Sequence, residues 1–270
     1  MFESEKDVLD WYESQPRSID STFQRSIPWD EVRRHPLNPR LAPILLYMRD
    51  VESFTDQYYR ELLRTPTGKD PVIRRFMDRW GAEEADHGQL LNRFLSEAGV
   101  PASRRWRADV RASVSLRYRL ESYISTYVTN LFGTHFTGTH MVWGAINELA
   151  TLHGYRRLWQ LAGHPVLERI LRAIAQEESA HAHFYLSVAR LRLERSKLSR
   201  RVARFFVERF WAPVGQGLKS RKETDYVVGT LFRGQAGIDI ADRYINQRIA
   251  RLPGFAGLRT ITERVAAVAH

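Results

Sequence analysis

Residues 73–94, IRRFMDRWGAEEADHGQLLNRF, place a Glu and a His where an amphipathic helix would carry apolar side chains. The positions on one helical face step alternately by four and three residues: Ile73, Met77, Trp80, Glu84, His87, Leu91 and Phe94. Such a stripe is typical of the inward face of a helix in a bundle. Burying an uncompensated carboxylate costs on the order of several kcal/mol. Glu84 therefore indicates a partner for its charge inside the bundle.

The same pattern returns in a second stripe, in which Glu and His again take consecutive positions: Leu167, Leu171, Ile174, Glu178, His181, Tyr185 and Val188. Two further stripes each contain a lone Glu. Glu52 lies in the stripe that runs from Leu41 to Leu62, and Glu148 in the one from Met141 to Tyr155. The sequence thus predicts two helix pairs, each of which offers a lone Glu and then a Glu-x-x-His.

Glycine and proline punctuate the rest of the chain, and no convincing alternating strand is present. We predict an all-α protein, with a four-helix bundle core and additional flanking helices, in a single domain of residues 1–270. The helices expected to bind metal span about 41–63, 71–98, 122–161 and 165–195, with C-terminal helices in 197–270. Gly133 or Gly138 could divide the third of these into two helices.

The composition excludes several classes of protein. The chain has no cysteine, which rules out disulfides, thiolate metal ligands and cysteine nucleophiles. No apolar run approaches the roughly 20 residues that a membrane span needs. The polar N-terminus, MFESEKDVLD, lacks the basic and then apolar order of a secretory signal. We therefore expect a cytoplasmic protein without a membrane span.

The net charge points to an acidic partner. Lysine and arginine number 41 against 31 acidic residues, which gives a formal charge of +10. Nucleic acid, an anionic membrane surface or an acidic protein could balance this charge. The arginines are spread through the chain, without a zinc finger, an RNP motif or a convincing helix-turn-helix. We therefore do not expect a nucleic-acid partner.

The four glutamates and two histidines of the stripes predict a metal centre. Four buried carboxylates repel one another, and arginine or lysine partners, raised pKa values or cations could relieve the repulsion. The stripes contain no Lys or Arg near these positions. Two divalent metals would balance four carboxylates, and this ligand set is that of carboxylate-bridged di-iron and di-manganese bundles. Asp50 and Asp56 lie close to Glu52 in the sequence and are alternatives to it as ligands. We interpret Glu83 and Glu177 as residues that either support the metal ligands from outside or face the solvent.

The stretch WGAEEADHGQLLNRFL, Trp80–Leu95, resembles the soluble acyl-acyl-carrier-protein desaturases, which are ferritin-like di-iron carboxylate enzymes. EESAHAHFY, at 177–185, resembles the second motif of that family, with Glu177 where the plant enzymes carry Asp. NELAT, at 147–151, matches the segment with the third-helix ligand, and VESFTDQYY, at 51–59, aligns more loosely. RLPGFAGLRTITERV, at 251–265, resembles the terminal helix, so the resemblance spans most of the chain.

The resemblance implies two iron ions, or manganese in some preparations, with O2 as co-substrate. The metal ligands that it implies are Glu52, Glu84, His87, Glu148, Glu178 and His181. It also implies that Thr151 assists proton delivery, and that Glu177 and Trp29 lie on an electron-transfer route. The implied reaction introduces a double bond into an acyl chain on acyl carrier protein. A ferredoxin-type electron donor and a homodimer complete the expected partners.

Three other functions compete with this interpretation. Another di-iron oxygenase, such as a hydroxylase or an N-oxygenase, could act on a carrier-bound substrate with the same ligands. A non-catalytic ferritin-like bundle could store metal, although storage favours acidic channels and this chain is basic. A nucleic-acid-binding bundle would show salt-sensitive DNA binding without metal.

Overall fold

The computed structural model describes residues 2–101, 103, 105–113, 126–127 and 129–269. Over these residues the protein is all-α, and its only β feature is an isolated bridge between Gln216 and Lys219. The all-α prediction is confirmed. None of the helices in the described part of the chain is long and apolar enough to cross a bilayer.

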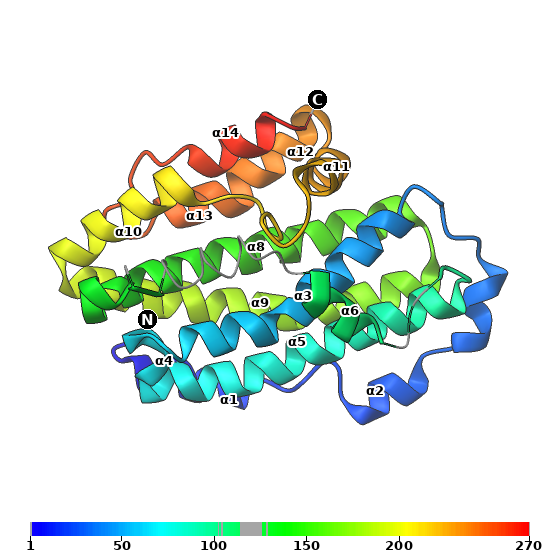
Figure 1. Ribbon diagram of the computed structural model, residues 1–270, viewed down its shortest axis with the longest axis horizontal. Helices are drawn as coiled ribbons and strands as arrows, with labels where there is room; N and C mark the ends of the chain where they lie inside the picture. The colour runs from blue at the N-terminus through cyan, green and yellow to red at the C-terminus, as the bar shows by residue number, and fades with distance from the viewer. Residues whose placement is uncertain (1, 102, 104, 114–125, 128, 270) are drawn as a thin grey trace.

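Four long helices form a ferritin-like bundle and run side by side (Figure 1). They are α3 (Ala42–Leu62), α5 (Pro71–Glu97), α8 (Thr137–Ala162) and α9 (Pro165–Arg195). The short α4 (Pro66–Lys69) joins α3 to α5, and two residues join α8 to α9. Such short connections make neighbouring helices antiparallel. The two helix pairs predicted from the stripes are therefore the two hairpins of the bundle.

Local sequence signals set the ends of these helices. Asp70 caps α5, because its carboxylate accepts hydrogen bonds from the backbone N–H groups of Val72 and Ile73 at 3.0 and 3.3 Å. Gly163, with a φ of 56°, ends α8 in the left-handed conformation that glycine adopts without strain. Pro165 then occupies the first turn of α9.

The third predicted helix, over about 122–161, is divided into two helical stretches, as the glycines of the segment allowed. Residues 126–127 and 129–132 are helical, the 3-10 helix η2 (Gly133–Phe136) follows, and α8 begins at Thr137. Gly133 has a φ of 56°, so the chain turns there rather than at Gly138. Residues 122–125 and 128 of the predicted helix lie outside the described residues.

Shorter elements cover two sides of the bundle (Figure 1). On one side lie α1 (Glu5–Ser14), α2 (Ser21–Ser26) and the 3-10 helix η1 (Trp29–Arg34); α6 (Trp106–Ser113) packs against α3. On the other side lie α10 (Lys197–Phe210), α11 (Arg221–Leu231), α12 (Gly234–Ala241), the π-helical turn η3 (Asp242–Asn246), α13 (Gln247–Ala250) and α14 (Thr260–Ala266).

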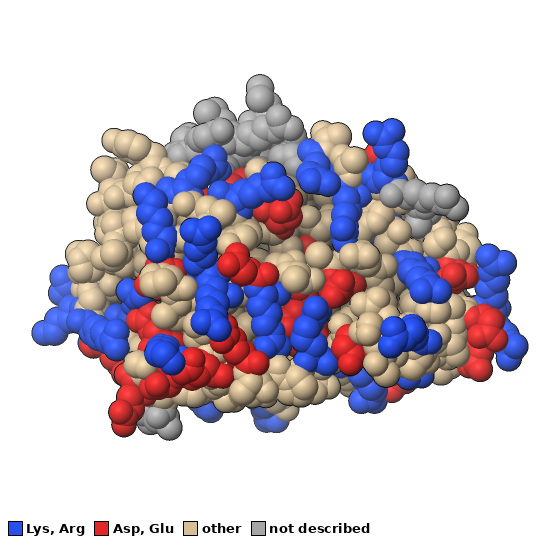
Figure 2. All heavy atoms as spheres, turned by 90° about the horizontal axis from the view of Figure 1, so that it is seen from below, with Lys and Arg blue, Asp and Glu red and all other residues tan. Residues whose placement is uncertain are grey.

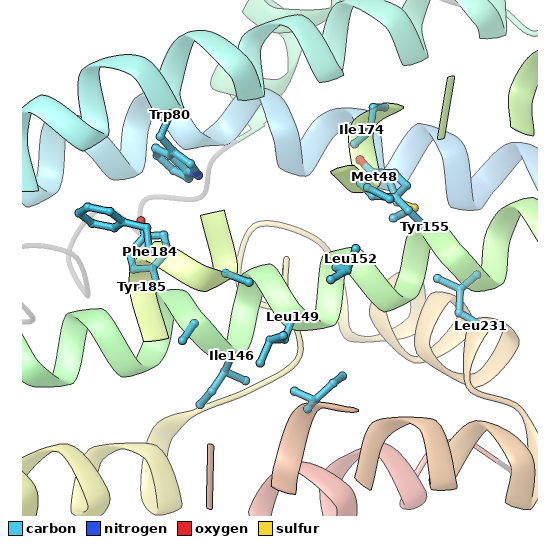
Figure 3. Close-up of a cluster of buried hydrophobic side chains, with 14 of the residues drawn as sticks. Met48, Trp80, Ile146, Leu149, Leu152, Tyr155, Ile174, Phe184, Tyr185 and Leu231 are labelled. Carbon is cyan, nitrogen blue, oxygen red and sulfur yellow. The ribbon is translucent and has the colours of Figure 1, made fainter. Parts of the chain in front are cut away.

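The helix α8 is buried on more than one side, because it lies between the bundle and the C-terminal helices. Ile146 and Leu149 point from α8 toward those helices, whereas Tyr155 lies on the other side, near Met48 and Ile174 (Figure 3). All five side chains are buried. A helix that is apolar around most of its circumference is expected at the centre of a fold.

Candidate metal centre

The structure brings the six predicted ligands to one place in the middle of the bundle. Each of the four long helices contributes from its buried stripe, and all six side chains are buried. Their ligand atoms form two groups that could each hold a metal ion: Glu52, Glu84, His87 and Glu178, and Glu84, Glu148, Glu178 and His181. Glu84 and Glu178 belong to both groups. The arrangement therefore offers two adjacent metal positions with two carboxylates that could bridge them.

The two imidazole rings point the same nitrogen, Nδ1, into the cluster. His87 Nδ1 lies 3.4 Å from Glu178 Oε1 and 3.7 Å from Glu52 Oε2. His181 Nδ1 lies 3.2 Å from Glu84 Oε1 and 3.5 Å from Glu148 Oε2. Each helix pair thus provides one histidine and one lone glutamate, but each histidine also faces a carboxylate of the other hairpin.

The opposite ring nitrogen of each histidine is held by a carboxylate from the facing helix. His87 Nε2 lies 3.0 Å from Glu177 Oε2, and His181 Nε2 lies 2.8 Å from Glu83 Oε2. A carboxylate behind a ligating imidazole fixes its tautomer and orientation and makes it a better ligand. Glu83 and Glu177 are both buried, which excludes the solvent-facing alternative considered for them.

The N-terminal segment closes this outer layer, a role that sequence reasoning missed. The Tyr12 hydroxyl donates to Glu83 Oε2 at 2.5 Å, and the backbone N–H of Ile19 donates to Glu177 Oε1 at 2.9 Å. Arg17 Nε lies 3.5 Å from Glu83 Oε1 and 3.8 Å from Glu177 Oε1. One guanidinium therefore faces both outer carboxylates. No periodic pattern in the sequence predicts these contacts, because the partners lie far apart along the chain.

The two lone glutamates also have partners outside the cluster. The Tyr155 hydroxyl donates to Glu52, and Trp80 Nε1 donates to Glu148 Oε1 at 3.1 Å. Gly88, directly after the first Glu-x-x-His motif, permits the close approach of α3. A Cβ on Gly88 would lie 3.4 Å from the Cβ of Glu52 and 3.0 Å from the Trp106 ring.

Burial and crowding shift the pKa values of the cluster. Burial raises the pKa of Glu84 well above the usual range, and the neighbouring charges of Glu52 and Glu178 raise it further. Burial alone would raise the pKa of Glu178, but hydrogen bonding with the two histidines lowers it. Burial alone would lower the pKa of His87, but its hydrogen bonds with carboxylates, Glu177 foremost, raise it well above its usual value.

The unsatisfied atoms of the cluster test whether metal fits the site. Buried polar atoms in folded proteins almost always have hydrogen-bond partners. Here several buried atoms have none, and they belong to five of the six predicted ligands: Glu52 Oε2, Glu84 Oε1, His87 Nδ1, both carboxylate oxygens of Glu178, and His181 Nδ1. Carboxylate oxygens and imidazole nitrogens suit divalent first-row metals such as iron and manganese. The residues therefore fit a pair of such ions.

An apolar cavity of about 70 Å³ lies beside the cluster, between α3, α8 and the C-terminal helices. Glu52 and the half-buried Thr151 contribute to its wall, which is otherwise mainly apolar: Tyr47, Met48, Val51, Ala150, Gly154, Trp211, Pro213, Val214, Val227, Val228, Leu231, Phe232, Ile245, Ile261 and Val265. The cavity is smaller than the roughly 300–1,000 Å³ of typical ligand pockets. A long ligand would require the wall to move apart.

Trp29 lies apart from this network. The Arg93 guanidinium stacks over the Trp29 ring at 4.1 Å, and the indole Nε1 has no hydrogen-bond partner. Among the described residues, no hydrogen bond joins Trp29 to Glu177 or to either histidine of the cluster. The electron-transfer role of Trp29 stays a prediction.

The carboxylates considered as alternatives to Glu52 have other partners. Asp50 forms ion pairs with Arg49 and Lys219, both at 2.6 Å. Asp56 is exposed and pairs with Arg60. Neither belongs to the two metal-binding groups, whereas Glu52 does.

Two comparisons with known proteins were informative in different ways. No curated protein matches the chain, but a family model does. The family model described as fatty acid desaturase matches residues 57–214, which is more than half of the chain. The matched segment contains five of the six clustered residues, while Glu52 precedes it. By its sequence from residue 57 to residue 214, and in keeping with the paired metal-binding groups inside its bundle, this chain belongs to the fatty acid desaturase family.

Proposed function

We propose that the chain is a di-iron, O2-dependent desaturase that introduces a double bond into an acyl chain carried on acyl carrier protein. The observation that carries this proposal is the position of the apolar cavity, whose wall includes Glu52, one of the residues of the metal-binding groups. An acyl chain in this cavity would place methylene groups beside the metal pair. A dry apolar cavity also protects a strong oxidant from water.

In the proposed reaction, two hydrogens leave adjacent methylene groups, and O2, two electrons and two protons complete the formation of two water molecules. When bound, the two iron ions supply the oxidising chemistry that breaks unactivated C–H bonds. Glu84 and Glu178, which belong to both metal-binding groups, would help to hold both ions, and Glu52 and His87 would complete one group and Glu148 and His181 the other. Manganese would fit the same ligands.

The remaining residues position groups and move protons. Glu177 and Glu83 hold Nε2 of the two histidines, so that Nδ1 faces the cluster. We assign proton delivery to the Thr151 hydroxyl, because this side chain belongs to the cavity wall together with Glu52. The electrons would come from an acidic, ferredoxin-type donor, which the net charge of +10 favours. A homodimer is part of the same proposal.

Product analysis tests the proposal directly. The iron-loaded protein, with a ferredoxin and its reductase, would receive palmitoyl-acyl carrier protein, and mass spectrometry would follow the acyl group. A loss of two hydrogens is expected. A gain of oxygen would instead indicate a hydroxylase or another oxygenase. Absence of O2 consumption by the reduced, iron-loaded protein would indicate a non-catalytic bundle.

A variant of Gly154 tests the cavity separately from the metal. A Cβ at this position would make ordinary contacts of 3.6 Å with Leu231 and Met48, so Gly154→Ala should be tolerated. Gly154→Val adds two methyl groups more than Gly154→Ala at the cavity wall. It should keep full metal content but lose turnover of palmitoyl-acyl carrier protein, with Gly154→Ala as the matched control. Equal turnover by both variants would place the acyl chain elsewhere.

A further inference from the structure

The exposed side of α10 carries apolar and positively charged residues in alternation. Leu198, Arg201, Phe205 and Arg209 follow one another at steps of three, four and four residues, so they share one side of the helix. All four are exposed: Leu198 is 48% and Phe205 53% exposed, and Phe210 at the end of the helix is 58% exposed. We call these five residues the α10 face.

The α10 face has an unusual balance of charge. The helix contains five cations and one carboxylate, Glu208, which pairs with Arg204. Within the part of the chain that the structure describes, Arg201 and Arg209 form no ion pair. The other side of the molecule, where α1 and α2 lie, differs, because its lysines and arginines are interleaved with acidic side chains (Figure 2). The α10 face therefore combines unpaired positive charge with exposed aromatic rings.

This combination indicates a protein partner with negative charge. Phenylalanine and arginine are enriched at protein interfaces, where aromatic anchors supply much of the binding energy. A second copy of the chain, related by a two-fold axis, would bring the arginines of both α10 faces together, which repulsion disfavours. A bilayer is also disfavoured, because the broad apolar side of α10, with Val202 and Val207, is buried in the protein.

The chain connects the α10 face to the apolar cavity. Trp211 follows Phe210 directly, and Trp211 and Pro213 both line the cavity beside Glu52. Trp211 Nε1 also donates to Asn147 Oδ1 at 3.3 Å, next to Glu148 on α8. A partner bound to the α10 face would therefore sit close to the cavity that we assign to the acyl chain.

We propose that the α10 face is the docking surface for the acyl carrier protein, an acidic protein that delivers its acyl group to the cavity. This inference rests on the proposed function, because it identifies the partner through the acyl chain. Carboxylates of the carrier would meet Arg201 and Arg209, and a small apolar patch would cover Phe205.

Binding and turnover, measured separately, test the proposal. The binding probe is fluorescently labelled palmitoyl-acyl carrier protein, titrated with the iron-loaded chain. The Arg201→Glu/Arg209→Glu double variant should weaken binding by about tenfold or more, since each reversal replaces attraction by repulsion. Phe205→Ser should weaken it without changing the net charge. Arg25→Glu, an exposed single charge reversal on α2, is the control for a reversal away from α10 and should leave binding unchanged.

Turnover of palmitoyl-coenzyme A, which has no carrier protein, should be unchanged in the α10 variants, while KM for palmitoyl-acyl carrier protein rises. Equal carrier binding by wild type and both α10 variants would overturn the docking surface and leave the proposed function intact. Turnover of palmitoyl-coenzyme A by a chain that does not bind the carrier protein at all would also overturn the docking surface. Failure to turn over either thioester would instead refute the proposed function, and carrier binding that depends on α10 would still support the surface.

Two further measurements address the rejected occupants. The first is binding to vesicles of phosphatidylcholine and phosphatidylglycerol. If the double variant loses vesicle binding but keeps carrier binding, the α10 face would be a membrane-binding surface and not the carrier's docking surface. A change from dimer to monomer on Phe205→Ser, again with carrier binding intact, would assign the α10 face to a second copy of the chain.

Discussion

Glu177→Gln is a sharp test of the layer that holds the histidines. The substitution keeps the shape of the side chain and removes its charge. In the native structure, one carboxylate oxygen accepts the N–H of Ile19 at 2.9 Å and the other lies 3.0 Å from His87 Nε2. An amide offers one acceptor and one donor group, so it cannot accept hydrogen bonds on both sides.

Either orientation of the new amide has a cost. If its NH2 group faces His87, the imidazole must accept at Nε2 and carry its proton on Nδ1, the atom that faces the cluster and would bind metal. If its NH2 group faces Ile19, two buried donors oppose each other, which costs about 1–3 kcal/mol. Loss of such an outer partner lowers metal affinity by about 10–100-fold, or about 1.4–2.7 kcal/mol. The two figures agree, and we expect a 10–100-fold weaker affinity.

Chelator competition under anaerobic conditions would measure the affinity for Fe²⁺ and for Mn²⁺. Glu168→Gln, on the same helix but at a partly exposed position paired with Arg172, is the control and should behave as wild type. Nitrogen NMR of the histidine rings, at a pH above the raised pKa of His87 so that the ring is neutral, would report the tautomer of His87 in the metal-free protein. Wild-type affinity in Glu177→Gln, with His87 still protonated at Nε2, would refute the reasoning.

Three more predictions concern the cluster itself. Glu178→Gln removes a carboxylate common to both metal-binding groups, so metal per chain should fall to less than half of the wild-type value by elemental analysis; wild-type content would contradict its ligand role. Tyr155→Phe leaves Glu52 without its hydroxyl donor, and denaturant unfolding of the metal-free protein should show a loss of about 1.5–3 kcal/mol; an unchanged free energy would show that this hydrogen bond contributes nothing. The raised pKa of His87 means that the metal-free fold holds a proton that the unfolded chain releases, so the stability from this group is present below pH 6.5 and is lost as the pH rises through the folded-state pKa. The raised pKa of Glu84 has the same sign, and its contribution begins to be lost above pH 4.5. Thermal melting from about pH 6.5 to about pH 9 should therefore show a falling Tm without metal, and a constant or rising Tm would refute this assignment.

The alternation of four- and three-residue steps made the inner site predictable. This spacing fixes which side chains face the bundle interior, so the stripes placed Glu84, His87, Glu178 and His181 together before any coordinates. The same argument located Glu148 and, among several nearby carboxylates, Glu52. The costs of burying charge then pointed to metal, because no cation of the chain itself lies in the stripes.

The outer layer could not be found in this way. Tyr12 and Arg17 contact residues that are far away in the sequence. The periodicity of one helix shows which of its side chains face inward, but it does not show which residue of another element they meet. The cavity could not be predicted for the same reason, because the C-terminal helices, which are distant in sequence from α3, form much of its wall. The break before α8 depended on a single backbone conformation at Gly133, and the composition of the segment did not distinguish Gly133 from Gly138.

The bond between Ile19 and Glu177 spans 158 residues and has a consequence for biosynthesis. Ile19 leaves the ribosome long before α9 exists, so it must wait for its partner until a further 158 residues have been added to the chain. Proteolytic trimming before residue 20 would spare all six inner side chains, yet it would remove the contacts of Tyr12, Arg17 and Ile19 with the two carboxylates that hold the imidazole rings. Bulky fusions at the amino terminus therefore risk producing a helical protein that loads iron poorly.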